Sequence, residues 1–332
     1  MHTTTTLEAA RQRLIDLPFV PLGHYPSPVD EWWRLREAIR GNQGAVIAAK
    51  RDDSIAFGFG GNKVRKLCLV AAAAKAAGAD TLITCGGVQS NHARATAAAA
   101  TRIGARCIIV ANGEKPERLT ANALLDDLLG AELRYVPSRA DRIPGMRAVV
   151  DEVRARGGKP YEIPLGASTP LGALGIARGV GELARQGVTP DVIVHASSSG
   201  GTQAGILLGC AIFGLNARVI GVSADDPENA IRDKVLPIIA GAEEMLGLSA
   251  GDLGTASRFE LDHTFVGDGY GAPTEASQEA QRLLARTEAV FVDHYYTAKA
   301  LAALIAYVRD GRLARDRKIL FWHTGGQVTL FQ

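Results

Sequence analysis

The sequence predicts an α/β protein made of two domains, each built on an open, twisted, parallel sheet. Length is the first reason, because 332 residues correspond to roughly two domains. The second is that short β-branched runs alternate with helical runs from Asp80 onward. Continuous apolar strands separated by helices are typical of parallel sheets that are covered on both faces. The third is that the alternation restarts after Pro164, which indicates a second α/β unit.

The expected elements follow in chain order. The first residues, MHTTTTLEAARQRL, indicate a polar start and then an amphipathic helix. In the first unit we expect strands at 81–85, 106–111, 132–136 and 160–164, and helices from Asn91, at 118–129 and at 143–156. After the glycine-rich loop at 166–175 we expect a helix to Gln186, a helix from Thr202, and strands at 191–196, 218–224 and 318–323.

Composition and charge exclude several classes of function. The chain has 47% apolar residues, 22% charged residues and a net charge of +2, as in ordinary soluble globular proteins, and we expect no nucleic-acid or membrane partner. The apolar run at 67–79 is broken by Lys75 and is too short to cross a bilayer, and the N-terminal segment has no apolar signal-peptide core. The cysteines lie in apolar patterns without metal-ligand spacing, so we expect buried thiols and a cytoplasmic protein: Cys68, Cys85, Cys107 and Cys210.

Lys63 stands directly behind a glycine turn, in the segment 58–68 (GFGGNKVRKLC), at the start of a long apolar helix. A cation in the first turn of a helix is unfavourable unless it is neutralised or paired. A lysine on a tight turn suits a Schiff-base cofactor, because the amine is the nucleophile and the glycines let a flat ring approach the backbone. Lys66 is the rival amine. A Walker A loop is excluded, because the order Gly-Asn-Lys-Val lacks the required Gly-Lys-Ser/Thr.

The segment 197–205 (SSSGGTQAG) lies between a predicted strand and a predicted helix. Backbone N–H groups at such a glycine turn, with hydroxyls at a helix N-terminus, form a nest for phosphate. A simple turn with a capping serine is one alternative, and a dinucleotide site with Asp225 as the ribose acid is another. The glycine spacing G-G-x-x-x-G differs from the dinucleotide pattern G-x-G-x-x-G, which favours a smaller phosphate ligand.

Ser90 and Asn91, in the segment 87–92 (GVQSNH), begin another predicted helix. They are either helix caps or groups that present a hydroxyl and an amide to a carboxylate. A serine-hydrolase elbow is excluded, because Val88 and His92 occupy the positions where glycines are needed.

Further candidates lie late in the chain. Tyr270 lies in a glycine-rich loop and Tyr296 at a predicted helix start, where tyrosines either pack or contact ligands. Thr324 follows a strand, which is where α/β sheets place ligands. His294 and His323 lack a third ligand at metal spacing, so we expect no metal site.

Taken together, these segments resemble the D-cysteine desulfhydrase and 1-aminocyclopropane-1-carboxylate deaminase family. These are pyridoxal-phosphate enzymes of the tryptophan-synthase-β-like fold, also called fold type II. The resemblance runs over most of the chain, in this order: YPSP, KRDD, GGNKVRKL, QSNH, SSGGTQAG, GYG, YTAK and HTGG.

The resemblance implies a role for each matched residue. Lys63 would hold the cofactor as a Schiff base, Asn91 would contact its phenolic oxygen, and Ser90 would bind the substrate carboxylate. Their neighbours Gln89 and His92 are further substrate-binding candidates. The remaining implied residues are the phosphate cradle Ser199, Gly200, Gly201 and Thr202, the catalytic tyrosines Tyr270 and Tyr296, and the cofactor contacts Thr297 and Thr324.

The chain departs from the family pattern at a few positions. Related ring-opening deaminases carry a glutamate that faces the pyridine nitrogen, where this chain has Thr297, as in desulfhydrases. The segment 293–296 reads Asp-His-Tyr-Tyr where relatives usually read Asp-Pro-Val-Tyr, and Trp322 and Gln327 replace smaller apolar residues. We therefore expect a remodelled pocket wall.

The resemblance implies a lyase of amino-acid metabolism that catalyses β-elimination on a small amino acid, first of all a D-cysteine desulfhydrase. A serine or phenylserine dehydratase and a 1-aminocyclopropane-1-carboxylate deaminase are alternatives. Alternatives of another kind are a nicotinamide-dependent oxidoreductase and a silent cofactor-binding relative. We expect a larger domain of residues 1–65 and 165–332, an inserted smaller domain of residues 66–164, and a homodimer.

Overall fold

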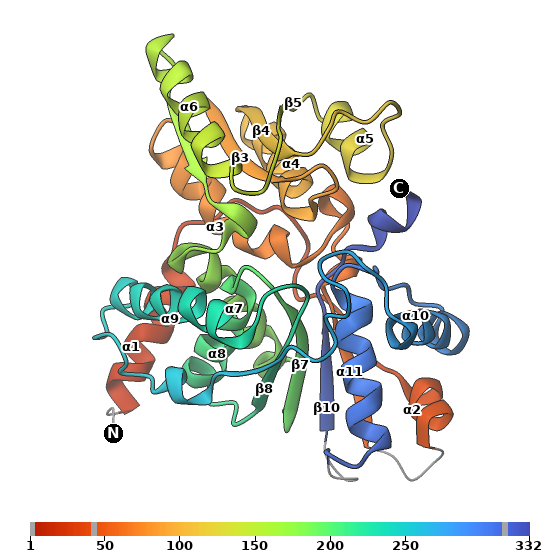
Figure 1. Ribbon diagram of the computed structural model, residues 1–332. Helices are drawn as coiled ribbons and strands as arrows, with labels where there is room; N and C mark the ends of the chain where they lie inside the picture. Colours follow the sequence, from red (N-terminus) through yellow and green to blue (C-terminus); the bar gives the residue numbers. More distant parts are fainter. Residues whose placement is uncertain (1–3, 41–44, 314–317) are drawn as a thin grey trace.

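The computed structural model describes residues 4–40, 45–313 and 318–332. Its strands form two separate sheets, each flanked by helices, with the smaller sheet above the larger one in Figure 1. The order is β1-β2-β10-β7-β8-β9 in the larger sheet and β5-β4-β3-β6 in the smaller one. The predicted α/β class with two parallel-sheet domains is thus confirmed.

The larger sheet is parallel except at one edge, where β1 runs antiparallel to β2. An antiparallel edge strand is common on otherwise parallel sheets. Its strands are β1 (Val29–Glu31), β2 (Val46–Arg51), β7 (Val192–Ser197), β8 (Arg218–Ser223), β9 (Glu260–Asp262) and β10 (Lys318–His323).

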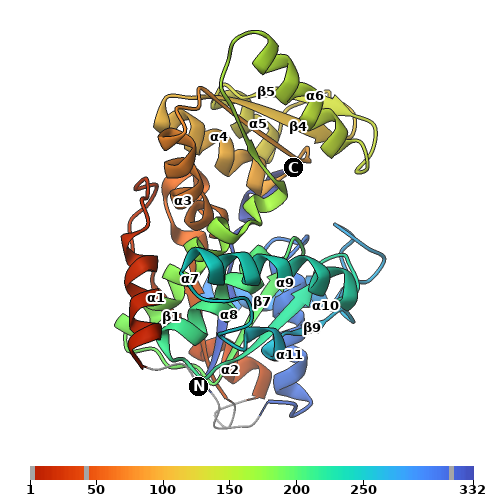
Figure 2. The same cartoon turned by 90° about the vertical axis from the view of Figure 1, so that its left-hand side faces the viewer.

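Side chains alternate between the two faces of this sheet. On β10, Leu320 and Trp322 join one apolar cluster, whereas Ile319 and Phe321 join the other. Each cluster is closed by its own helices, which Figure 2 shows from the side. The first group is α1 (Thr4–Asp16), α7 (Pro170–Arg185), α8 (Gly201–Phe213) and α9 (Glu228–Met245), and the second is α2 (Trp33–Arg40), α10 (Glu275–Glu288) and α11 (Thr297–Arg309).

The smaller sheet is parallel throughout and is likewise covered on both faces. Helix α3 packs against both α4 and α7, so it connects the layers of the two sheets. The strands are β3 (Thr81–Gly87), β4 (Arg106–Asn112), β5 (Glu132–Val136) and β6 (Pro160–Ile163); the helices are α3 (Asn62–Ala76), α4 (Asn91–Ile103), α5 (Ala121–Leu128) and α6 (Arg142–Ala155). The exact domain division at residues 66 and 164 stays a prediction.

Short 3₁₀ turns connect several of these elements: η2 (Asp52–Ser54), η3 (Phe57–Phe59), η4 (Leu165–Ala167), η5 (Thr255–Arg258) and η6 (Gln327–Phe331). All four cysteines are buried free thiols, as expected. Among the described residues, no helix is long and apolar enough to cross a membrane. The predicted polar start at residues 1–3 lies outside the described residues.

Candidate active site

Polar side chains from both sheets surround a cavity of about 260 Å³. The start of α3 contributes Lys63, and the turn after β3 contributes Ser90. The turn after β7 contributes Thr202, and the segment after β10 contributes Thr324. The carboxyl ends of parallel strands therefore meet at the cavity, which is where α/β sheets bind their ligands.

The glycine turn before Lys63 is required by close backbone contacts. A Cβ on Gly60 would lie 2.4 Å from the Ile55 carbonyl oxygen, and a Cβ on Gly61 would lie 3.0 Å from that of Thr324. Both glycines have positive φ angles, 71° and 96°, which other residues rarely adopt. The turn thus brings the first residues of α3 against the end of β10.

The amine of Lys63 lines the cavity and donates a hydrogen bond to Asn62 Oδ1 at 3.1 Å. The pKa of Lys63 is lowered to about 8, because burial and the charge of Arg94 together outweigh the opposing effect of Asp293. A lysine with such a pKa has a useful neutral fraction near pH 7, as a nucleophile or a general base requires.

The rival amine, Lys66, does not line the cavity. It is fully buried, and its Nζ donates to the Gly166 carbonyl oxygen at 3.1 Å and to Ser168 Oγ at 3.2 Å. Burial lowers its pKa well below the ordinary value, and the charge of Lys63 adds to the shift. Its amine lies beneath the turn at Gly201 instead, 2.8 Å from a Cβ placed there.

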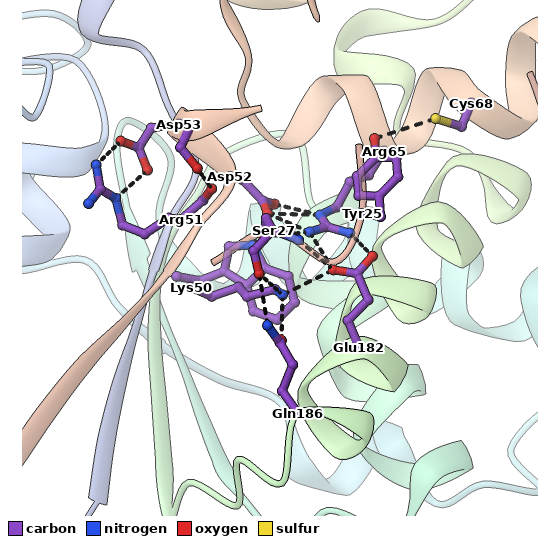
Figure 3. A network of polar contacts seen from close by, with 12 residues as sticks. Tyr25, Ser27, Lys50, Arg51, Asp52, Asp53, Arg65, Cys68, Glu182 and Gln186 are labelled. Carbon is purple, nitrogen blue, oxygen red and sulfur yellow. Dashed lines mark hydrogen bonds and ion pairs between the residues drawn. The ribbon is translucent and has the colours of Figure 1, made fainter. Parts of the chain in front are cut away.

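A buried charge network anchors α3 next to Lys63 (Figure 3). Arg65 donates to both carboxylate oxygens of Asp52 at 2.8 Å and to both of Glu182 at 2.8 and 3.0 Å. Lys50 approaches the same Glu182 carboxylate at 3.0 Å. The Asp52 carbonyl oxygen also accepts the Gly61 N–H at 2.8 Å, so the network holds both the helix and the glycine turn that precedes it.

The predicted phosphate cradle lies at the N-terminus of α8. No side chain caps this helix at Gly200, so N–H groups of its first turn are available to an anion. Thr202 Oγ1 accepts from Asn62 Nδ2 at 2.8 Å, and Ser199 Oγ lies 2.8 Å from Ser168 Oγ. Three of the cradle residues line the cavity, namely Ser199, Gly200 and Thr202. The fourth, Gly201, has no room for a side chain, because a Cβ there would lie 2.7 Å from Ser168 Oγ.

Ser90 and Asn91 line the cavity, but each also has a structural partner. Ser90 is the N-cap of α4 and accepts the Ala93 N–H at 3.2 Å. Asn91 Oδ1 accepts from Asn122 Nδ2 at 2.9 Å, which directs its own amide N–H groups elsewhere. Ser90 is thus a helix cap that also faces the cavity, and the binding of a carboxylate by either residue stays a prediction.

The two residues that flank Ser90 and Asn91 differ, because His92 lines the cavity and Gln89 does not. His92 lines the cavity, bonded through Nε2 to Thr84 Oγ1 at 2.8 Å, and burial keeps its pKa well below the ordinary value, so the ring is neutral. Gln89 does not line the cavity, which corrects its assignment as a substrate contact. Its side chain instead binds the start of α5, accepting the Asn122 N–H at 2.9 Å and donating to the Thr120 carbonyl oxygen at 3.3 Å.

Tyr270 and Tyr296 meet at the cavity, where their hydroxyl groups are hydrogen-bonded to each other. Burial raises the pKa of Tyr270 to about 12 and that of Tyr296 well above 10. Both phenols are therefore protonated at neutral pH and can donate protons rather than accept them.

Thr297 is not among the residues that line the cavity, and its role as a cofactor contact stays a prediction. It is fully buried, and its hydroxyl donates to Asp293 Oδ2 at 2.5 Å. The residues expected to remodel the pocket wall also lie elsewhere. Trp322 donates to Asp52 Oδ2 at 2.8 Å within the core, and Gln327 donates to the Asp53 carbonyl oxygen at 3.1 Å.

The two other unusual residues, His294 and Tyr295, contact Gln332 and do not line the cavity. The expectation that these four residues remodel the pocket wall was wrong. In the described part of the chain, no group of three potential metal ligands is found.

Three arginines that the sequence motifs did not indicate also line the cavity. Arg94 is fully buried and donates to the Gly60 carbonyl oxygen at 2.9 Å. Arg139 and Arg142 come from the end of a loop and the start of α6. Arg94 follows the segment 87–92 closely and could have been found from it, whereas no motif marks the other two.

Comparisons with known proteins agree with this geometry. A family described as pyridoxal-phosphate dependent enzyme matches residues 20–325. A 1-aminocyclopropane-1-carboxylate deaminase of Methylobacterium nodulans is 36% identical over 93% of this chain and 95% of its own. A D-cysteine desulfhydrase of Klebsiella pneumoniae is 35% identical over 96% of this chain and 97% of its own. A crystal structure of a 1-aminocyclopropane-1-carboxylate deaminase homologue is 34% identical with a TM-score of 0.89, and the match covers 100% of this chain and 97% of that one.

The chain belongs to the family of pyridoxal-phosphate dependent enzymes. The residues present fit this cofactor, because an amine and an uncapped helix N-terminus face one cavity and Gly201 leaves no room for a Cβ. The nicotinamide-dependent alternative is therefore wrong, as the spacing of the glycines already indicated.

Proposed function

We propose that this enzyme is a β-elimination lyase that acts on a small α-amino acid, in the manner of a D-cysteine desulfhydrase. The observation that carries the proposal is the position of Lys63. Its amine, with a pKa of about 8, shares one cavity with Ser90 and with a pair of protonated tyrosines. That arrangement supplies a base, a carboxylate site and an acid for one reaction.

In this proposal Lys63 holds the cofactor, and the α8 N-terminus with Ser199, Gly200 and Thr202 binds its phosphate. Pyridoxal phosphate, when bound, supplies an electron sink for the negative charge that develops on the substrate Cα. Asn91 contacts the cofactor ring through its free amide N–H groups.

The chain's own residues then carry the proton transfers. Ser90 and the adjacent backbone orient the substrate carboxylate, and Lys63 removes the proton from Cα. The bond from Cβ to its substituent breaks with the electron pair on the substituent, and Tyr296 or Tyr270 donates a proton to it. Overall, the amino acid and one water give a 2-oxo acid, ammonia and the protonated substituent.

Position 297 favours elimination over cyclopropane ring opening. Ring opening benefits from a protonated cofactor ring, which an acidic partner of the ring nitrogen maintains. Thr297 offers no carboxylate there, and its hydroxyl is already donated to Asp293. A substrate with a good leaving group demands less of the ring, which supports the desulfhydrase type.

We also propose that the enzyme is a cytoplasmic homodimer. Its mass in solution and its location after cell fractionation would test this.

An absorption spectrum and a substrate screen test the proposal together. The purified protein should show an imine band that borohydride removes, that Lys63→Ala abolishes and that Lys66→Ala retains. Loss of the band in Lys66→Ala alone would contradict the assignment of the amine. Cysteine and serine of both chiralities, 3-chloroalanine and the cyclopropane amino acid are then assayed for ammonia and a 2-oxo acid. A band without any turnover would indicate a silent relative, and strong turnover of the cyclopropane substrate would refute the argument from Thr297.

A further inference from the structure

Two guanidinium groups of the smaller-sheet unit, those of Arg139 and Arg142, line the cavity together with Lys63 and Ser90. Both arginines come from the smaller-sheet unit, whereas the predicted phosphate cradle belongs to the turn after β7 in the larger sheet. The reaction proposed above requires a base, an acid and a carboxylate site, and it assigns no task to either arginine.

Each guanidinium group lies close to a segment that carries a predicted substrate-binding or catalytic residue. Arg142 Nε donates to Asn112 Oδ1 at 2.5 Å, and its Nη2 lies 3.7 Å from a Cβ placed on Gly87, the first residue of the segment that carries Ser90. The guanidinium carbon of Arg139 lies 4.4 Å from the centroid of the Tyr270 ring. One arginine thus approaches the carboxylate-binding turn and the other approaches the proton-donating tyrosines.

Among the described residues, no carboxylate forms an ion pair with Arg139 or Arg142. The acidic groups that line the cavity are otherwise engaged, because Asp226 is paired with Lys234 and Asp225 accepts a hydrogen bond from Ser198 at 3.0 Å. Burial lowers the pKa of Arg142, and the like charge of Arg139 lowers it further. An anion between the two guanidinium groups would relieve both costs.

We propose that Arg139 and Arg142 bind a second acidic group on the substrate, so that the enzyme prefers small amino acids whose Cβ carries an anionic substituent. A sulfonate or a phosphate fits this class, because planar guanidinium groups bind such oxyanions through paired hydrogen bonds. The inference rests on the proposed lyase function and names its substrate class.

The same contacts assist departure of the substituent. When the bond from Cβ to a sulfonate sulfur breaks, the electron pair leaves on sulfur as sulfite, and the two guanidinium groups stabilise the charge that stays on it. The organic fragment takes up one water and gives the 2-oxo acid and ammonia, so no external oxidant or reductant is needed.

Steady-state kinetics of the holoenzyme test this inference. Both enantiomers of cysteate are compared with those of cysteine, and 3-chloroalanine reports on elimination from a neutral substrate. We expect cysteate to have the higher kcat/KM. Arg142→Gln should lower the ratio of kcat/KM for cysteate over 3-chloroalanine by about 10- to 100-fold, since hydrogen bonds to charged groups have this effect. Arg139→Gln, whose side chain is exposed, should lower it less.

Arg147→Gln is the matched control, because Arg147 is an exposed arginine on the same helix that does not line the cavity. An unchanged ratio in that variant together with a reduced one in Arg142→Gln supports the proposal. An equal loss for every substrate in Arg142→Gln would mean that the guanidinium binds the common α-carboxylate, and this would overturn it. Preference of the wild-type enzyme for cysteine over cysteate would also overturn it and leave the lyase intact. Failure to turn over 3-chloroalanine would instead refute the lyase and, with it, this inference.

Discussion

Replacing Arg65 by methionine removes the centre of the buried network that holds α3. Arg65 donates hydrogen bonds to Asp52, Glu182 and Ser27, at distances between 2.7 and 3.0 Å. Its side chain is 2% exposed, and those of Asp52 and Glu182 are 0% and 5% exposed. Removing one partner of a buried ion pair leaves an uncompensated charge, so we expect the free energy of unfolding to fall by about 3–5 kcal/mol.

The remaining partners keep the loss within that range. Asp52 retains the indole N–H of Trp322 at 2.8 Å, and Glu182 retains Lys50 at 3.0 Å. Arg65→Lys should cost less than Arg65→Met, because lysine keeps the charge but lacks the planar fork that bonds two carboxylates. Urea unfolding followed by circular dichroism measures both values against the wild type.

The control is Arg106→Met, which breaks an exposed ion pair. Arg106 and Glu132 lie 3.5 Å apart with side chains 69% and 42% exposed, so we expect a loss below about 1 kcal/mol. A loss of that small size for Arg65→Met as well would refute the reasoning.

The effect should also depend on pH. Burial raises the pKa of Glu182, but Arg65 and Lys50 outweigh it, so the folded pKa lies below the unfolded value of 4.5. The pair therefore stabilises the fold at neutral pH and loses this contribution as pH falls through the folded pKa. In Arg65→Met the lowering effect of Arg65 on the pKa of Glu182 is lost, so burial raises that pKa and the carboxylate is protonated more easily. The difference in stability between variant and wild type should thus shrink between pH 7 and pH 4; a constant difference would contradict this account.

Other predictions concern the cavity. In cofactor-free protein, capture of pyridoxal phosphate by Lys63 should quicken as pH rises through about 8, because the neutral amine is the nucleophile; a midpoint near 10.5 in the rate of band formation would contradict the lowered pKa. Gly201→Ala should weaken cofactor binding at least about tenfold. The control is Gly214→Ala at the other end of α8, where a Cβ meets nothing within 4 Å. It should cost about 1 kcal/mol of stability and leave the cofactor Kd unchanged. Ser90→Ala should raise KM about tenfold and lose a helix cap of about 1 kcal/mol; an unchanged KM would count against carboxylate binding.

The sequence by itself determined the fold class and the segments that meet at the cavity. Strands of a parallel sheet are buried on both faces and therefore appear as short apolar runs, and the helices between them have their own periodicity. Both patterns are local and can be seen in the sequence. The turn before Lys63 was also visible, because backbone contacts at Gly60 and Gly61 exclude other side chains. The segments after β7 and β10 could be placed together, since both strands belong to one parallel sheet and end at the same edge.

Only the tertiary structure decided which side chains of those segments face the cavity. Lys63 and Lys66 lie nearly one turn apart on α3, and the rotation of that helix, set by the Arg65 network, turns only the first toward the cavity. Thr297 and Gln89 lie outside the cavity lining, because the Thr297 hydroxyl is donated to Asp293 and Gln89 binds the start of α5. Arg139 and Arg142 carry no motif, and they reach the site because folding brings the smaller sheet against the larger one. Side-chain direction depends on packing between elements that are distant in sequence, which no local pattern records.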